Sequence, residues 1–352
     1  MSSAKCVTIG RLKFGGGAPI RVESMLKSRL ESVGDCMDEL DTLKRAGCEL
    51  VRVAFPGESL SANLRELAEK SEVPLMADIH FNHRLALAAI DSGCASVRIN
   101  PGNMSGGDGL MSVLSAAKAS GAVIRIGANA GSLSNRQMES RGKDRAAALV
   151  AAVEEQLIPL LDMGFEDVIM SAKSSSVPET VRANFILAQR YPFPLHIGIT
   201  EAGAGTDGAV KSASGLGALI AQGIGDTMRV SLTGESREEV EVAYSILRSM
   251  EVRRRGVNLI SCPGCGRRHV DVGELVRQVK SLLTRDVPDG LTVAVMGCEV
   301  NGPKEAAAAD IGIAGTQRGF VMFKKGSMAA SGDLSKLEEI LKKELAGSIP
   351  TI

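Results

Sequence analysis

Residues 49–80, ELVRVAFPGESLSANLRELAEKSEVPLMADIH, contain the pattern that decides the fold. Two short runs that favour β-strands enclose ANLRELAEKS (62–71), whose apolar residues recur at helical spacing. Similar runs recur along the chain, and helix-like segments fill most of the gaps. The predicted strands are PIRVES (19–24), ELVRVAF (49–55), PLMADIH (74–80), SVRIN (96–100), VIRIGAN (123–129), DVIMSAK (167–173), PLHIGIT (194–200) and TMRVSLT (227–233). Eight β and α units in about 250 residues predict an α/β fold, a TIM (β/α)8 barrel, with a doubly wound open sheet as the alternative.

The segments on either side of these units extend the prediction. Residues 7–18, VTIGRLKFGGGA, predict a hairpin that closes the bottom of the barrel. The last helix of the barrel is predicted at 236–250, with Ser236 as its cap. A basic link, EVRRRG (251–256), follows, and the composition changes after it.

Beyond the link we expect a small α+β domain of three strands and two helices. The strands are predicted at 291–297, 310–315 and 319–326, and the helices at 271–283 and 334–347. We therefore assign residues 1–253 to a TIM-barrel substrate-binding domain and residues 254–352 to the second domain.

The composition argues against several classes of protein. Lys and Arg together number 41, as do Asp and Glu, so the net charge is zero, which disfavours bulk binding to nucleic acid or anionic membranes. Trp is absent and aromatic residues make up 3%, which disfavours base-stacking platforms. No apolar run reaches the ~18–20 residues that span a bilayer, and the first residues do not resemble a signal peptide. We expect a cytoplasmic protein with no nucleic-acid or membrane partner.

Polar residues alternate at the carboxyl ends of the predicted strands, where TIM barrels hold their active sites. Residues two apart lie on the same side of a strand, so these side chains converge on one region. The residues that we expect to bind substrate are Arg52, Asp78, His80, Arg98, Asn100, Arg125, Asn129, Lys173, His196, Thr200, Arg229 and Ser231. Their five Arg and Lys side chains outnumber the carboxylates of Glu23, Asp78 and Glu201, which indicates an anionic substrate with phosphates. Mutually neutralising ion pairs are the alternative.

Glycine-rich turns follow several of these strands, as in NPGNMSGGDG (100–109), NAGS (129–132) and TEAGAGTDG (200–208). Such turns can offer backbone N–H groups to phosphate oxygens, or they are ordinary strand-to-helix connections. Glu201 directly follows the seventh predicted strand and is the best-placed carboxylate for acid–base catalysis. A structural role for Glu201 is the alternative.

Three of the seven cysteines form a separate pattern. Cys262 and Cys265 lie in a CxxC turn, and Cys298 ends an apolar strand 33 residues later. Three thiolates fit a [4Fe–4S] cluster with a different fourth ligand, for which Glu305 is a candidate. Zinc, a redox disulfide or no site at all remain alternatives. The other cysteines lie singly among apolar residues, and we interpret them as small buried hydrophobes: Cys6, Cys36, Cys48 and Cys94.

Several long motifs occur together and in order along nearly the whole chain. They are RVAFP (52–56), ADIHFN (77–82), RINPGN (98–103), RIGANAGSL (125–133), PLHIGITEAG (194–203), GIGDTMRVSLTG (223–234), SCPGCGR (261–267) and MGCEVNGP (296–303). With these motifs the chain resembles the family of bacterial 4-hydroxy-3-methylbut-2-en-1-yl diphosphate synthases, iron–sulfur reductases of the methylerythritol phosphate route to isoprenoids.

The resemblance implies a TIM barrel followed by a small α+β iron–sulfur domain. It implies a [4Fe–4S] cluster held by Cys262, Cys265, Cys298 and Glu305. The implied reaction is the reductive ring opening and dehydroxylation of 2-C-methyl-D-erythritol 2,4-cyclodiphosphate to 4-hydroxy-3-methylbut-2-enyl diphosphate, with two electrons from ferredoxin or flavodoxin. Glu201 is then the candidate for assisting loss of the hydroxyl group. The resemblance also implies a head-to-tail homodimer in which the cluster domain of one subunit caps the barrel of the other.

The chain departs from the family's pattern in places. The first-strand motif usually reads QSMT, whereas residues 23–27 are ESMLK, and Lys304 stands where the family usually has Gly. The first change adds a carboxylate and a cation beside the expected pocket, so a related enzyme with a shifted substrate is one alternative. The rival from another class is a non-catalytic, zinc-stapled phosphosugar-binding protein. A zinc hydrolase is disfavoured because the four histidines are scattered: His80, His83, His196 and His269.

Overall fold

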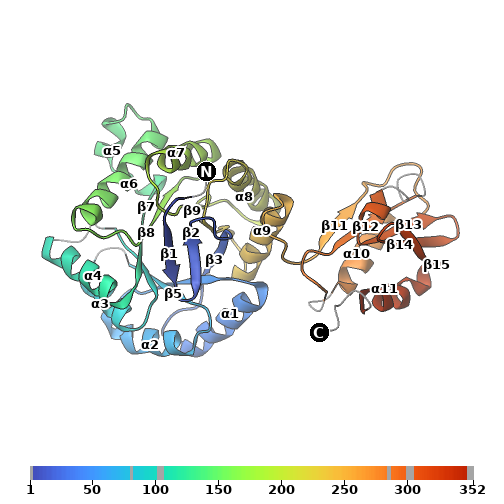
Figure 1. The fold of residues 1–352 in the computed structure, drawn as a ribbon, viewed down its shortest axis with the longest axis horizontal. Coiled ribbons are helices and arrows are strands. Elements are labelled where there is room, and N and C mark those ends of the chain that lie inside the picture. The colour runs from blue at the N-terminus through green and yellow to red at the C-terminus, as the bar shows by residue number, and fades with distance from the viewer. Residues whose placement is uncertain (1–2, 80–81, 101–106, 284–286, 299–304, 347–352) are drawn as a thin grey trace. The chain divides into compact units, whose positions relative to one another are not determined.

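The chain divides into two units, residues 1–253 and 254–352 (Figure 1). Each unit has its own hydrophobic core. The structure is a computed structural model that describes residues 3–79, 82–100, 107–283, 287–298 and 305–346. Within these residues, no helix combines the length and the apolar character needed to cross a membrane.

Eight parallel strands form the sheet of the first unit. They are β3 (Arg21–Met25), β4 (Leu50–Ala54), β5 (Leu75–Asp78), β6 (Ser96–Arg98), β7 (Val123–Asn129), β8 (Val168–Lys173), β9 (His196–Ile197) and β10 (Thr227–Met228). The sheet runs from β8 back to β3 through sequence neighbours, then to β10 and β9. A parallel bridge between Met170 and Leu195 links β8 to the residue before β9 and completes the ring. The predicted TIM barrel is confirmed, and the open-sheet alternative is wrong.

Helices surround the strands, as Figure 1 shows. They are α1 (Val33–Ala46), α2 (Ser61–Lys70), α3 (His83–Asp91), α4 (Gly107–Ser120), α5 (Asn135–Glu139), α6 (Arg145–Asp162), α7 (Val177–Arg190), α8 (Gly205–Ile220) and α9 (Ser236–Ser249). Their sequences carry ordinary start and stop signals. The Ser32 hydroxyl caps α1 by accepting from the Asp35 N–H, and Gly47 ends the helix in the left-handed region at φ 101°. Helix α1 buries Cys36, Leu40 and Leu43 on one face.

One predicted helix cap is wrong. Helix α9 begins at Ser236 itself, with Glu235 in the cap position and no capping hydrogen bond from its side chain. The Ser236 hydroxyl donates instead to Glu39 at 2.5 Å, because the packing of α9 beside the first strand-to-helix loop brings this carboxylate within reach.

The predicted hairpin is present and seals the amino-terminal end of the barrel. Strands β1 (Cys6–Ile9) and β2 (Leu12–Gly15) pair antiparallel. The prediction that Cys6 is a buried hydrophobe is wrong, because it alternates with Val7 on β1 and lies on the exposed face of the strand. The hairpin buries Val7, Ile9 and Phe14 against a layer of apolar side chains from the first residues of the barrel strands. That layer consists of Leu50, Met76, Val123 and Ile169. The carboxyl ends of the strands are therefore left for a polar site.

The second unit is a five-stranded mixed sheet with two helices. Its strands, in spatial order, are β11 (Asn258–Ser261), β12 (Thr292–Met296), β13 (Ile311–Thr316), β14 (Gly319–Lys324) and β15 (Ser327–Gly332). Its helices are α10 (Val272–Leu282) and α11 (Leu337–Ala346), which contribute Leu275, Val279, Leu337, Leu341 and Leu345 to one core with the sheet. The sequence did not predict β11 or β15. Both lie at an edge, and the SMAASG sequence of β15 lacks the apolar alternation that marks a strand.

Candidate active site

A polar cavity of about 210 Å³ lies at the carboxyl ends of the barrel strands. Its lining residues are Arg52, Asp78, Arg98, Arg125, Ile126, Gly127, Asn129, Ser171, Lys173, Thr200, Arg229 and Ser231. Nine of these twelve are residues that the sequence places at strand ends as substrate ligands. The alternation along each strand thus brings the expected side chains together in one cavity.

The other candidates of the barrel lie elsewhere. His80 falls outside the described residues. Asn100 is half-buried beyond the end of β6 and is not among the lining residues. His196 is fully buried and does not line the cavity. It contacts Lys173, which does. Glu201 is exposed and does not line the cavity, but its backbone is left-handed at φ 51°, a strained conformation that is common at functional sites.

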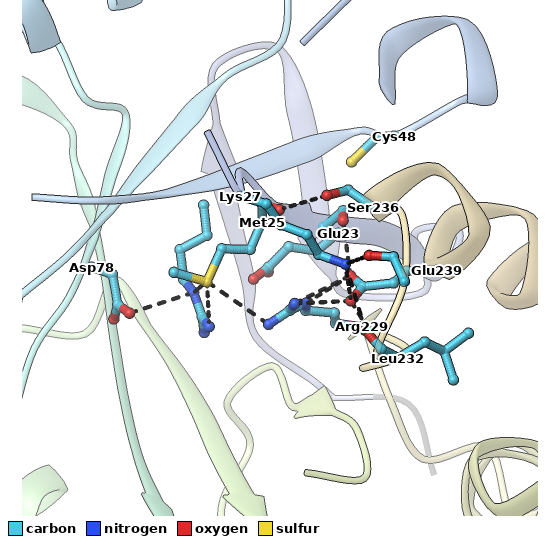
Figure 2. A network of polar contacts seen from close by, with 12 residues as sticks. Glu23, Met25, Lys27, Cys48, Asp78, Arg229, Leu232, Ser236 and Glu239 are labelled. Carbon is cyan, nitrogen blue, oxygen red and sulfur yellow. Dashed lines mark hydrogen bonds and ion pairs between the residues drawn. The ribbon is translucent and has the colours of Figure 1, made fainter. Parts of the chain in front are cut away.

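Carboxylates hold three of the cavity's arginines in place. Figure 2 shows the two carboxylates involved, Asp78 and Glu239. Asp78 lies between Arg98, whose Nη1 is 3.2 Å from Oδ1, and Arg52, whose Nε is 3.6 Å from Oδ2. Arg229 forms a forked pair with Glu239, with Nη2–Oε distances of 3.1 and 3.2 Å. Glu239 was not predicted, because it comes from helix α9, whereas strand alternation indicates only the charged groups at strand ends.

A methionine sulfur lies between two of these guanidinium groups. Sδ of Met25 is 3.2 Å from Nε and 2.9 Å from Nη2 of Arg52, and 3.9 Å from Nη1 of Arg229 (Figure 2). A thioether is a weak and neutral acceptor. Met25 therefore orients both cations without cancelling their charge.

The loop after β3 is tied to the loop after β10. Lys27 donates to the carbonyl oxygens of Gly234 and, at 3.5 Å, Leu232. The Ser236 hydroxyl, which donates to Glu39, also lies 3.3 Å from the Met25 carbonyl oxygen. Lys27, which departs from the family pattern, thus serves here as a connection between two loops and is not a lining cation.

Arg125 and Glu23 form a buried ion pair inside the barrel. Nη1 of Arg125 lies 2.7 and 2.5 Å from the two carboxylate oxygens of Glu23. The two side chains are 2% and 0% exposed. Within the described residues, Nη2 of Arg125 has no hydrogen-bond partner although it is buried. Because Arg125 lines the cavity, this nitrogen is a donor that a bound anion can satisfy.

Lys173 and His196 form a second buried contact. Nζ of Lys173 is 2.7 Å from Nε2 of His196, and Nδ1 of His196 is 3.5 Å from Oε2 of Glu23. Burial lowers the pKa of Lys173 well below its usual value, and nearby arginines lower it further. Burial also lowers the pKa of His196 well below its usual value.

The accumulated positive charge affects Arg52 as well. Burial lowers the pKa of its guanidinium to about 10, an effect that Asp78 opposes and that Arg125 and Arg229 reinforce. Within the described residues, four arginines of the cavity face three carboxylates, so an excess of positive charge remains even when Lys173 is neutral. Such a cavity suits an anion that carries more than one negative charge.

The cysteine pattern lies at one end of the second unit's sheet. Strands β11 and β12 are parallel with Ser261 opposite Val295, so Cys262 and Cys298 follow strands that end at the same edge. The Gly297 N–H donates to Sγ of Cys262 at 3.2 Å. Cys262 is half-buried, Cys265 is exposed and Cys298 is buried, and all are free thiols. An N–H···S bond stabilises a thiolate and is typical of sulfur ligands to metals.

Glu305 begins the helical turn that follows the undescribed residues 299–304, and it is exposed. Its neighbour Ala306 belongs to the same apolar cluster as Cys262, which places both near one end of the sheet. In the described ranges, no three His, Cys, Asp or Glu side chains are close enough to hold a metal ion. The donor types, three thiols and a carboxylate, fit an iron–sulfur group, whereas the described residues do not form a ready-made pocket for it.

Comparison with known families covers nearly the whole chain. Residues 4–244 match the GcpE TIM-barrel domain, and residues 258–347 match the GcpE protein C-terminal domain. A protein of Maridesulfovibrio salexigens is 46% identical over 337 residues, covering 95% of this chain and 94% of that protein. A protein of Natranaerobius thermophilus is 42% identical over 339 residues, covering 96% and 95%. Both are named 4-hydroxy-3-methylbut-2-en-1-yl diphosphate synthase (flavodoxin).

Two solved structures with low sequence identity match about the length of the barrel. Dihydropteroate synthase of Yersinia pestis is 12% identical with a TM-score of 0.50, over 71% of this chain and 100% of that chain. The 3-dehydroquinate dehydratase of Geobacillus kaustophilus is 15% identical with a TM-score of 0.50, over 71% and 99%. These likenesses show a shared fold only. Given both domain matches and the full-length relatives, the chain is an enzyme that belongs to the GcpE family, the family of the 4-hydroxy-3-methylbut-2-en-1-yl diphosphate synthases.

Proposed function

We propose that the chain catalyses the reductive ring opening of 2-C-methyl-D-erythritol 2,4-cyclodiphosphate to 4-hydroxy-3-methylbut-2-enyl diphosphate. The observation that carries the proposal is the excess of cations in a cavity at the catalytic end of a TIM barrel. Two electrons and two protons open one C–O bond to phosphate, release the neighbouring hydroxyl group as water and leave a C=C bond. The reaction thus balances with an external electron donor, for which the names of the relatives favour flavodoxin over ferredoxin.

The barrel residues bind and orient the diphosphate in this proposal. Arg125 offers its unpartnered Nη2, and the pairs with Asp78 and Glu239 hold other guanidinium groups in fixed positions. Fixed donors lose little conformational entropy when the anion arrives. Asn129, Thr200 and Ser231 supply neutral hydrogen-bonding groups in the same wall.

The second unit would hold the redox cofactor. Cys262, Cys265, Cys298 and Glu305 are the residues that we propose as ligands of a [4Fe–4S] cluster. Such a cluster, when bound, supplies electrons one at a time. The Gly297 N–H that reaches Cys262 would stabilise the thiolate charge.

Glu201 is the proposed acid–base group, and Glu201→Gln tests it. We expect kcat to fall by about 10²-fold or more, since a positioned general acid contributes about 10²–10⁴-fold. Iron content and substrate affinity are expected to stay unchanged. The matched control is Glu235→Gln, which removes an exposed carboxylate from another loop at the same end of the barrel. Near-normal turnover of Glu201→Gln with an intact cluster would remove Glu201 from this role.

Metal content and turnover test the function as a whole. Protein purified without oxygen is expected to contain about four irons and four acid-labile sulfides per chain. With a flavodoxin and its reductase, this protein is expected to convert the cyclic diphosphate. The rival zinc-stapled binding protein would instead contain zinc without sulfide and would bind the ligand without converting it. That outcome would overturn the proposal.

The proposal also includes a cytoplasmic location and a head-to-tail homodimer. The seven cysteines are all free thiols, which suits a reducing compartment. The dimer rests on the resemblance described above, in which a cluster domain covers the partner's barrel. Sedimentation of the purified protein measures the oligomeric state directly.

A further inference from the structure

The Lys173 amine differs from the other cations of the cavity. Each lining arginine contacts a carboxylate, whereas Lys173 contacts the imidazole of His196, at 2.7 Å. Space for the amine comes from Gly198, where an added Cβ would lie 3.3 Å from Nζ of Lys173 and 2.8 Å from the Arg229 carbonyl oxygen. The backbone is thus adapted to hold a lysine head group against a histidine.

Glu23 lies at the other side of the same imidazole. Its Oε2 is 3.5 Å from Nδ1 of His196, which is an electrostatic contact, since Nδ1 has no hydrogen-bond partner within the described residues. The side chains of Glu23, His196 and Lys173 are at most 8% exposed. A carboxylate on this side favours the tautomer that carries its proton on Nδ1. Nε2 then keeps a lone pair, which accepts a hydrogen bond from the Lys173 amine whether that amine is neutral or charged.

The surroundings disfavour a charge on this pair in the ligand-free protein. The charged groups that act on Lys173 are Arg125, Arg52, Glu23 and Arg229. Three of the four are cations, and burial removes the water that would otherwise stabilise an ammonium group. The lysine pKa is therefore well below its usual value before an anion arrives.

We propose that Lys173 and His196 form a proton-loading pair, which takes up about one proton when a diphosphate binds in the cavity, and that Glu23 is the positioning residue that fixes its imidazole. The inference rests on the proposed function, because it assigns the diphosphate to this cavity. An incoming anion adds negative charge beside the amine and raises its pKa, so the ligand and the proton bind together. Lys173 becomes an ammonium group only when the negative charge of the substrate is present to balance it.

The direction of the pH dependence follows from linkage. The ligand-bound protein holds the extra proton between the pKa of Lys173 in the free protein and its higher pKa in the complex. Within that window the free protein binds fewer protons, so affinity weakens as pH rises, by up to tenfold per pH unit, about the slope of a single proton. Below the window both forms are protonated, and above it neither is, so the affinity levels off on both sides.

Titration calorimetry with the cyclic diphosphate tests the proposal on the full-length, cluster-containing protein. Without reductant the ligand binds but is not turned over, so binding is measured separately from chemistry. Each phosphorus of the ring carries one acidic proton, which is lost well below neutral pH, so the ligand does not titrate in the range used. The binding enthalpy, measured between about pH 6 and pH 9 in buffers of different ionisation enthalpy, gives the number of protons taken up.

Two variants and one control identify the side chain that takes up the proton when the ligand binds. Lys173→Met is expected to bind the ligand more weakly and to take up no proton. Glu23→Gln removes the negative charge that stabilises the ammonium form and is expected to move the uptake window to lower pH. A purely structural role for Glu23 would change affinity without moving that window. The control Lys118→Met removes an exposed lysine of α4 and is expected to leave uptake unchanged.

The outcomes separate this inference from the proposed function. Wild-type protein that binds and converts substrate without proton uptake would overturn the inference and leave the function standing. Uptake that persists in Lys173→Met would also overturn it, because another group would then carry the proton. If Lys173→Met binds the ligand too weakly for calorimetry, Glu23→Gln provides the test. A pH window of proton uptake that does not move in this variant would overturn the inference. Protein that converts no substrate under reducing conditions contradicts the function itself.

Discussion

Replacing Arg125 by methionine is expected to destabilise the barrel by about 3–5 kcal/mol and to remove substrate binding. Arg125 neutralises Glu23 in the barrel interior, where both side chains are almost fully buried. Removing one partner of a buried pair leaves an uncompensated charge, which costs about this much. Substrate binding is lost because the unpartnered Nη2 of Arg125 also disappears from the cavity wall.

Urea unfolding followed by tyrosine fluorescence measures this effect. Both tyrosines of the chain, Tyr191 and Tyr244, lie in the first unit, and Trp is absent, so the signal reports on the barrel alone. The midpoint is expected to fall in Arg125→Met. The double variant Glu23→Gln/Arg125→Met is expected to recover part of the loss, because no buried carboxylate is left unpaired.

An exposed ion pair provides the control for the arginine replacement. Arg182 contacts Asp144 at 2.7 Å, but the arginine side chain is 60% exposed. Arg182→Met is expected to change stability by less than about 1 kcal/mol, since exposed pairs contribute little. Equal midpoints for Arg125→Met and wild type would show that the buried pair does not stabilise the barrel.

Replacing Cys298 by serine is expected to reduce turnover to background. Cys298 is the buried thiol of the proposed ligand set and follows β12 at the sheet end that also carries Cys262. A serine hydroxyl at this position does not replace a thiolate as a ligand of iron. We expect iron and sulfide contents and the visible absorption to fall together with activity.

Substrate binding in the barrel separates loss of the cluster from loss of the fold. Since the two units have separate cores, Cys298→Ser is expected to retain calorimetric binding of the cyclic diphosphate. Cys6→Ser is the matched control, because it removes an exposed thiol from strand β1. Full iron and sulfide contents in Cys298→Ser would exclude this residue as a ligand.

The sequence predicted the cavity well because strand alternation is a local property. In β8, for instance, Ser171 and Lys173 lie two residues apart and both line the cavity. The partners of these side chains could not be predicted in the same way. Glu239 reaches Arg229 from a helix, and the pairing of Glu23 with Arg125 joins residues 102 positions apart. Such contacts depend on how the barrel closes, which no local pattern contains.

His196 illustrates the same limit at a single residue. Its position on β9 predicted a substrate ligand, but the side chain is fully buried and contacts Lys173 instead. Alternation indicates the side of the strand on which a residue lies. How deeply its side chain is buried depends on where each neighbouring strand of the barrel ends. In the second unit, β15 was missed for a different reason, because its small residues carry no periodic signal.

Apolar side chains close the amino-terminal end of the barrel, and the cavity lies at the carboxyl ends of the strands. Within the described part of the chain, the hairpin β1–β2 and the layer of Leu50, Met76, Val123 and Ile169 pack as one apolar cluster at the amino-terminal end. Under the proposed function, substrate and product therefore enter and leave at the opposite end, where the cavity lies. With one entrance, product has to depart before the next substrate can enter.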